Sequence, residues 1–433
     1  MGMKQSAVLF TSLILLGAAF MLPSTGASLA WTIQTVDDIN NARVGFIALD
    51  SNNDLHIAYL RSTGGHLNGE VYLMYASWNG NSWDIQEVAT DYSPEGLVID
   101  SSNNPHILCS SVGVLGLTYA SWNGTEWNLE SIDPDGRTGS VALDSLGNPH
   151  IAYNARDGAE KYAVSTGAGW SIHTIALESI DHAKSTNDDL GLPLIALDSS
   201  NNSHIIYQKN VQDYNLQQNT AESAIEYALW NISTREWNYE SVVSNATLES
   251  MALDSKGYPH FTYHKGIVSG ALCYASWNGT TWTTQIIDNL TPFSPSCLAI
   301  DANNRPHIIY LSNTGNLTYV RSTDNNSWDI QTDSAITGLS INSMTLDTYG
   351  NPYICYSRGI PFTGPYELLY ATVTENTQVP ATTSNDGANT LHSTGLLIAI
   401  PLIALAVLVI VLMFRRAKQK DGKARFSLFL SHP

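Results

Sequence analysis

Positive charge is scarce in this chain, which has 20 lysine and arginine residues against 39 aspartate and glutamate residues in 433. Six of the basic residues stand close together near the C-terminal end, between positions 415 and 425. An acidic surface repels phosphate backbones, so a nucleic-acid partner is not expected for the main body of the protein. With 43% hydrophobic residues the chain can nevertheless bury a large core, which excludes disorder as the default state.

Cysteine is also rare. The four cysteines, Cys109, Cys273, Cys297 and Cys355, show neither CxxC spacing nor the spacing of a metal knuckle. Their pattern allows either a disulfide in an exported protein or scattered small apolar residues in strands. No metal site and no cofactor is predicted from them.

Long apolar runs are confined to the two ends of the chain. Residues Ala7–Leu22 form an apolar run behind Lys4, and small residues follow as far as Ala30. This order is typical of a secretory signal peptide, so we expect residues 1–30 to be one, with cleavage after Ala27 or Ala30.

The second run, Gly395–Phe414, has the length that a helix needs to cross a bilayer and contains no charge. The basic segment 415–433 follows it directly. Because positive residues stay on the cytoplasmic side, we expect a single-pass protein of the cell membrane with its C-terminus in the cytoplasm. Residues 31–373 would be the external domain, and residues 374–394, rich in Thr, Asn and Ala, a flexible stalk.

The external domain is an internal repeat. The phrase IALDSNNDLHIAY at 47–59 returns in diverged form along the chain, and its aspartates are Asp50, Asp100, Asp144, Asp198, Asp254, Asp301 and Asp347. A spacing of about 50 residues is typical of a propeller blade of four strands. In the first repeat we expect strands at Val44–Asp50, Leu55–Leu60, Val71–Trp78 and Trp83–Ala89, joined by Asn/Gly/Ser turns.

The fourth strand begins with tryptophan in six repeats, at Trp83, Trp127, Trp170, Trp237, Trp282 and Trp328. The seventh repeat lacks this strand, whereas the isolated segment from Trp31 to Asp38 resembles it. We therefore predict an all-β, seven-bladed β-propeller in which the N-terminal strand completes the last blade and closes the ring, followed by one C-terminal transmembrane helix.

A histidine follows each of the first six aspartates by six residues, at His56, His106, His150, His204, His260 and His307. Six related imidazoles could suggest a metal ring. We favour a structural role, because ligands in separate blades rarely converge within the ~2 Å of a metal bond. The aspartates would cap turns, and the Tyr and Trp series would pack between blades.

The turns between the third and fourth strands carry a further signal. Ser77–Trp83, Ser121–Trp127, Ser276–Trp282 and Ser322–Trp328 resemble degenerate Asp-boxes, the S-x-D-x-G-x-x-W turns of sialidase-type propellers. These turns are one residue shorter than the box, and most have Asn in place of Asp. In that family the box is structural and lies on the face opposite the active site, so the resemblance implies the fold rather than the activity.

The connections on the opposite face are long and irregular, for example at 61–70, 176–193, 208–223 and 357–365. Variable loops on a rigid scaffold often carry function, so we expect the binding site there. Candidate ligand-binding residues are Arg43, Arg61 and Arg358, which fall in neighbouring blades and could hold a carboxylate or sulfate, as the arginine triad of sialidases does. Glu70, Glu95 and Glu367 are nearby carboxylates, and the acidic segment 181–189 is a weaker cation candidate. No catalytic residue is predicted.

Sequons for N-glycosylation are a further feature expected of an exported domain. They stand at Asn123, Asn201, Asn231, Asn245, Asn278, Asn289, Asn316 and Asn325.

Three functions fit this sequence. The first is a membrane-anchored surface propeller that binds an extracellular protein or glycan without catalysis. The second is a sialidase-like glycoside hydrolase or a lectin for anionic glycans. The third is a structural component of a cell-surface layer. The fold alone does not separate them, because propellers support all three.

Overall fold

The structure is a computed structural model. It describes residues 30–39, 41–64, 69–165, 167–177, 191–212, 221–266, 270–291, 295–323, 327–337, 339–359 and 366–373. Every element in these ranges is a β-strand, and no helix in them is long and apolar enough to cross a membrane. The predicted signal peptide, stalk, transmembrane helix and basic tail lie outside the described residues, except for Ala30.

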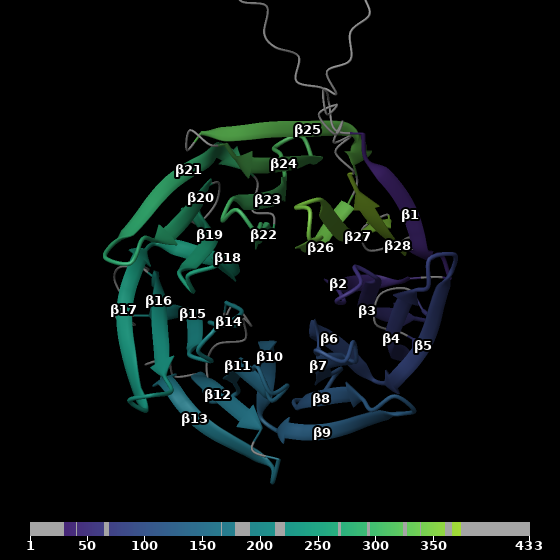
Figure 1. Cartoon of the computed structure of the whole chain (residues 1–433), viewed down its shortest axis with the longest axis horizontal. Helices are drawn as coiled ribbons and strands as arrows, with labels where there is room; N and C mark the ends of the chain where they lie inside the picture. The colour runs from purple at the N-terminus through teal and green to yellow at the C-terminus, as the bar shows by residue number, and fades with distance from the viewer. Residues whose placement is uncertain are drawn as a thin grey trace, which may run out of the picture. The chain divides into compact units, whose positions relative to one another are not determined.

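The strands form seven antiparallel sheets of four around a common axis (Figure 1). Blades 1 to 3 are β2 (Arg43–Leu49), β3 (Leu55–Ser62), β4 (Val71–Trp78) and β5 (Trp83–Thr90); β6 (Tyr92–Ile99), β7 (Pro105–Ser111), β8 (Leu117–Trp122) and β9 (Trp127–Asp133); β10 (Gly136–Leu143), β11 (Pro149–Ala155), β12 (Ala159–Ser165) and β13 (Trp170–Leu177).

Blades 4 to 7 are β14 (Leu194–Leu197), β15 (Ser203–Gln212), β16 (Ala221–Asn231) and β17 (Glu236–Ser244); β18 (Ala246–Leu253), β19 (Pro259–Lys265), β20 (Gly270–Trp277) and β21 (Trp282–Thr291); β22 (Cys297–Ile300), β23 (Pro306–Leu311), β24 (Asn316–Ser322) and β25 (Trp328–Thr337); and β26 (Leu339–Leu346), β27 (Pro352–Gly359), β28 (Tyr366–Thr372) and β1 (Thr32–Asp37). The predicted seven-bladed propeller is confirmed, with the strands of the first repeat within one residue of their expected starts.

The ring closes through the N-terminal strand, as predicted. β1 pairs with β28 in antiparallel register, with Thr32 opposite Thr372 and Gln34 opposite Tyr370. The last sheet therefore has the order β1-β28-β27-β26. Pairing the first and last strands of the propeller removes the exposed sheet edges that an open ring would leave.

Aromatic contacts join every blade to the next. In each case the ring of a third-strand tyrosine meets, edge to face, the tryptophan that begins the fourth strand of the following blade. The pairs are Tyr75–Trp127, Tyr119–Trp170, Tyr162–Trp237, Tyr227–Trp282, Tyr274–Trp328, Tyr319–Trp31 and Tyr370–Trp83, with centroids 5.3 to 5.9 Å apart. This geometry contributes beyond buried area alone, and Trp31 takes the same place as the other six tryptophans.

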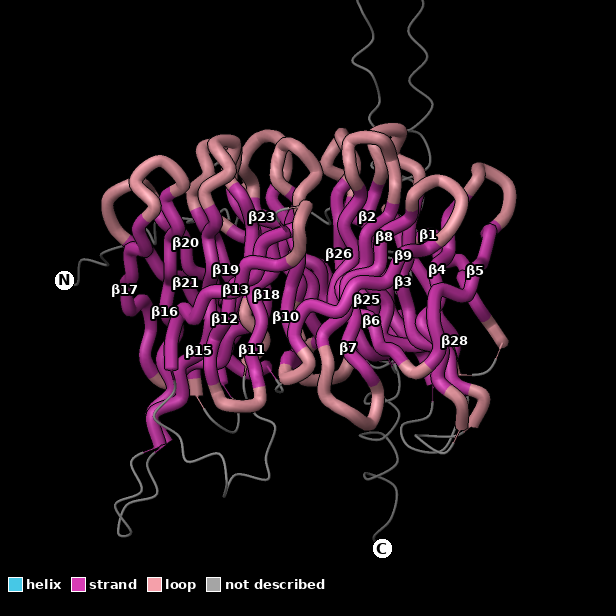
Figure 2. The backbone as a smooth tube through the Cα atoms, turned by 90° about the horizontal axis from the view of Figure 1, so that it is seen from below, coloured by secondary structure: helices cyan, strands magenta, loops and turns pink. Residues whose placement is uncertain are grey.

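The turn between the first and second strands of each blade is capped by its aspartate. Asp50 Oδ1 accepts hydrogen bonds from the backbone N–H groups of Asn52 and Asp54, both at 2.8 Å. The same pair of bonds forms at Asp347 in the last blade. These turns and those between third and fourth strands form one face, here called the short-turn face, along the upper edge of the ring in Figure 2. The opposite side is here called the long-loop face.

Replacing Trp31 by alanine should destabilise the whole propeller. It removes the indole ring that packs against Tyr319 where β1 closes the ring of blades. We expect a loss of about 3 kcal/mol in the free energy of unfolding, as for other large aromatic truncations. Urea unfolding followed by tryptophan fluorescence measures it. The control is Leu146→Ala, which removes a side chain that is 84% exposed; equal stability of the two variants would contradict the role of the seam.

Candidate functional site

On the long-loop face, Arg61 belongs to a buried network between blades 7 and 1. Its Nε donates to Asp37 Oδ2 at 2.8 Å, its Nη2 also contacts that oxygen, and Tyr59 Oη donates to it at 2.7 Å. Asp37 is only 3% exposed and lies on β1, whereas Arg61 and Tyr59 lie on β3. The Arg61 guanidinium therefore forms an ion pair with a carboxylate of the closing strand β1.

The same link occurs at two other blade boundaries. Asp133 accepts from Tyr153 Oη at 2.9 Å and from Lys161 Nζ at 3.0 Å, and Asp288 accepts from Tyr310 Oη at 3.0 Å. Each of these aspartates follows the tryptophan of its strand by six residues. The sequence alone therefore contains a signal for this link, namely an aspartate six residues after the tryptophan.

Arg43 and Arg358 approach neighbouring residues at the start of β28. Arg358 Nη2 donates to Glu367 Oε2 at 2.8 Å, with both side chains about half exposed. The Arg43 guanidinium carbon lies 5.8 Å from the centroid of the Tyr366 ring. The structure thus brings Arg43 and Arg358 to the start of β28, whereas Arg61 contacts β1, the neighbouring strand of the same blade.

Polar side chains that sequence analysis had not grouped occur where the innermost strands bulge. The register of β6 shifts between Pro94 and Gly96, and that of β18 between Leu248 and Ser250. In these bulges Glu95 Oε1 accepts from Ser110 Oγ at 2.6 Å, and Glu249 Oε1 lies 3.0 Å from His264 Nδ1. A bulge re-aims a side chain and is often found near a functional site.

The partners of these bulge residues share one sequence position. Each of them comes directly after the second-strand residue that aligns with Tyr59, as Ser110 and His264 show. In blade 7 this position is Ser357, whose Oγ donates to Asn342 Oδ1 at 3.2 Å. Innermost strands surround the axis of the ring (Figure 1). In blade 1 this position holds the apolar residue Leu60. A polar residue at the same position in another blade is therefore the sequence signal for such a contact.

Glu95 has an unusual ionisation. Burial raises the pKa of its carboxyl to about 7, although the hydrogen bond from Ser110 acts in the opposite direction. Glu70 and Glu367 have other partners: Glu70 contacts the Tyr72 hydroxyl, and Glu367 forms an ion pair with Arg358. The three predicted carboxylates therefore do not form a catalytic pair in the described structure.

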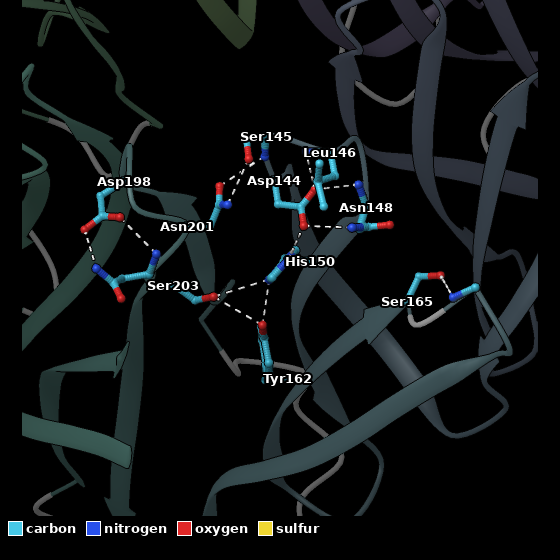
Figure 3. Close-up of polar contacts among 12 residues, drawn as sticks. Asp144, Ser145, Leu146, Asn148, His150, Tyr162, Ser165, Asp198, Asn201 and Ser203 are labelled. Atoms are coloured by element: carbon cyan, nitrogen blue, oxygen red, sulfur yellow. Dashed lines mark hydrogen bonds and ion pairs between the residues drawn. The ribbon is translucent and has the colours of Figure 1, made fainter. Parts of the chain in front are cut away.

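The repeated histidines connect turns to strands within their own blades. In blade 3, His150 Nδ1 lies 2.6 Å from Tyr162 Oη, and its Nε2 lies 3.7 Å from Asp144 Oδ2 (Figure 3). Ser203 of blade 4 joins this group, with its Oγ 3.2 Å from Tyr162 Oη. Burial lowers the pKa of His150, while the charge of Asp144 raises it. Within the described ranges, no three His, Cys, Asp or Glu side chains are placed to hold a metal ion.

The four cysteines are free, with Cys109, Cys273 and Cys355 buried and Cys297 half-buried. The sequence allowed either a disulfide or scattered small apolar residues in strands, and the structure shows the second arrangement.

The sequon asparagines occupy both faces. Asn123, Asn231 and Asn278 lie in turns between third and fourth strands, where Asn278 Oδ1 accepts from the backbone N–H of Thr280 at 2.9 Å. Asn201 is in a turn of the short-turn face, and Asn245 lies between β17 and β18. Asn325, the acidic segment 181–189 and most of the long connections lie outside the described residues.

No protein-family model and no curated protein matches the sequence. Solved structures do match. The polysaccharide lyase Uly1 is 10% identical with a TM-score of 0.52, over 80% of this chain and 99% of that one. A polysaccharide lyase of family PL25, an ulvan lyase, is 13% identical with a TM-score of 0.51, over 77% and 95%.

A protein of unknown function from Dyadobacter fermentans is 11% identical with a TM-score of 0.50, over 80% and 98%. The NanB sialidase from Streptococcus pneumoniae also matches, at 14% identity and a TM-score of 0.44, over 79% and 70%. At these identities the likeness establishes the fold. The chain is a seven-bladed β-propeller.

Removing the Arg61 guanidinium should destabilise the protein, because Asp37 is buried and would lose a charged partner. We expect Arg61→Ala to lower the free energy of unfolding by about 1 to 3 kcal/mol. Arg358→Ala, which breaks an exposed pair, should change it by less than about 1 kcal/mol. Chemical unfolding at pH 7 compares them, and a larger effect at Arg358 would refute the structural role of Arg61.

Glu95→Gln should remove a pH dependence of stability. The folded pKa of Glu95 is raised, so its contribution is fully present below the unfolded pKa near 4.5 and is lost as the pH rises through about 7. The variant should thus match the parent at pH 4 and exceed its melting temperature at pH 8. Calorimetry at the two pH values measures this. A difference that is the same at both would show that Glu95 ionises normally.

Proposed function

We propose that the protein is a membrane-anchored cell-surface propeller that binds an extracellular glycan or protein through its long-loop face, without catalysis. The observation that carries this is the contrast between the two faces. Repeated capping and aromatic residues account for most of the short-turn face, whereas the long-loop face holds charged residues that do not repeat, such as Arg358, Glu95 and Glu249.

Anchoring rests on the sequence of the two ends, namely the signal peptide expected at 1–30 and the span expected at 395–414. Because Thr32 pairs with Thr372, the chain enters and leaves the propeller at the same end of blade 7. That end belongs to the short-turn face.

A glycan is the favoured ligand. Structures of the same fold include a polysaccharide lyase bound to the acidic sugar repeat -[GlcA(1-4)Rha3S]-. Arginine recognises carboxylate and sulfate groups well, and Arg358 is half exposed beside Arg43. Absence of catalysis is part of the proposal, because Glu70, Glu95 and Glu367 each contact a different group and form no pair of the kind that glycoside hydrolysis needs.

Binding to a glycan array tests this. The full-length chain in detergent should bind anionic glycans, and Arg43→Ala/Arg358→Ala should lower the affinity about tenfold or more, because charge-assisted hydrogen bonds are lost. The matched control, Arg235→Ala/Lys256→Ala, removes the same charge from the short-turn face and should bind like the parent.

Two outcomes separate the alternatives. Turnover of fluorogenic sialosides or of an acidic polysaccharide by the same preparation would replace the binding module with an enzyme. Self-association of the full-length chain without any glycan or protein ligand would favour a structural surface-layer component.

A further inference from the structure

On the short-turn face, an asparagine links the first turns of neighbouring blades. Asn103 Oδ1 accepts from the backbone N–H of Ser51 in the preceding blade at 3.2 Å, and Asn304 Oδ1 from that of Ser255 at 2.8 Å. Asn201 makes the same link to Ser145, at 3.0 Å (Figure 3). Asn53 reaches Thr348 at 3.4 Å. These four asparagines have φ between 61° and 65°, a conformation that Asn tolerates.

Three boundaries lack this asparagine, because a glycine with φ between 77° and 84° stands at its position, at Gly147, Gly257 and Gly350. Of these three, the boundary between blades 6 and 7 also has Ala302 in the preceding blade, where the other two have a serine. Blade 7 also has no turn between its third and fourth strands, because β28 ends at Thr372 and the fourth strand is β1.

A pocket with a volume of about 100 Å³ opens at this place. Its walls are the turns that follow Asp301 and Asp347, together with the end of β24 and Val373. It is smaller than the sites of drug-sized ligands, so it can receive one small group of a larger molecule.

Two arginines line this pocket at positions where the repeat does not require them. Arg305 stands four residues after Asp301, where four other blades have an asparagine that donates to its aspartate at 2.8 to 3.0 Å. Arg321 stands two residues after Tyr319, where the other blades have Ser, Thr, Val or Leu. Six blades form without an arginine at either position, so the propeller fold does not require this pair.

The carboxylate in the pocket is directed into its own turn. Asp301 Oδ1 accepts from the backbone N–H groups of Asn303 and Arg305, both at 2.8 Å, and Oδ2 lies 3.5 Å from His307 Nε2. Burial lowers the pKa of His307, and the charges of Arg321 and Arg305 lower it further, whereas Asp301 raises it. Both guanidinium charges are therefore felt inside the pocket.

Arg321 Nε lies 3.4 Å from Asp329 Oδ2, and both side chains are about one-third exposed. A pair of this kind contributes little and can be exchanged for a ligand. The ring of Tyr349 lies at the rim and is 87% exposed, and the side chains of Asn303 and Asn351 complete the lining. An exposed aromatic face beside amides is suited to a sugar ring and its hydroxyl groups.

We propose that the pocket between blades 6 and 7 binds one acidic sugar residue of a glycan. Arg305 and Arg321 receive its carboxylate or sulfate, and Tyr349 packs against the ring. This site lies on the face opposite the one in the proposed function and is independent of it.

Isothermal titration of the full-length chain in detergent tests the site with three probes: glucuronate, galactose 6-sulfate and neutral glucose. The two anionic sugars should bind and glucose should not, and the better of the two identifies the anion. Arg305→Gln/Arg321→Gln should weaken binding tenfold or more. Arg235→Gln/Lys256→Gln, with the same loss of charge on the same face, and Arg43→Ala/Arg358→Ala should both leave it unchanged.

A second variant separates binding from folding. Gly350→Asn introduces the asparagine that four other blades have at this position, and a Cβ there would lie 3.6 Å from Asp301 Cβ, an ordinary contact. It should close the pocket and abolish sugar binding while the melting temperature stays equal or rises. Failure of the parent to bind either anionic sugar, undiminished binding by Gly350→Asn, or equal binding of a tetraglutamate peptide would overturn the proposal.

Discussion

The contact between a third-strand tyrosine and the next blade's tryptophan is the interaction on which the rest of this ring depends. It occurs at all seven boundaries in one edge-to-face geometry. Each blade alone is a small sheet with two apolar faces, so it becomes stable only when both faces are covered by neighbours. The repeated YASWNG segments supply this contact, since their tyrosine packs across the boundary and their Trp-Asn-Gly leads into the turn.

The closing strand makes blade 7 different from the other six blades. Because β1 comes from the other end of the domain, blade 7 has no covalent turn between its third and fourth strands. At one end of β1, the buried Asp37 forms an ion pair with Arg61 and accepts a hydrogen bond from Tyr59. At the other end lies the pocket of Arg305 and Arg321. The first arrangement recurs at Asp133 and Asp288, whereas no other blade has an arginine at the positions of Arg305 and Arg321.

In a repeat protein the residues that recur serve mainly to hold the blades together, and those that break the pattern become informative. His150 recurs because its imidazole joins a turn to a strand. By contrast, Arg305 replaces an asparagine that four other blades use to hold their aspartate. The proposed binding of an acidic sugar would give this arginine a role that the repeat does not require. For Glu95 the same comparison points to the bulge of β6 near the ring axis.

The sequence by itself determined the number of blades, the order of strands and the closure by Trp31, because each follows from a local pattern that recurs about every 50 residues. It also placed Arg43, Arg61 and Arg358 on one face. Only the tertiary structure decided their surroundings. Arg61 meets Asp37 across 24 positions, and Arg305 shares a pocket with Gly350 of the next blade. Contacts between blades join residues far apart in the chain, and no periodicity within one repeat encodes which charge will meet which partner.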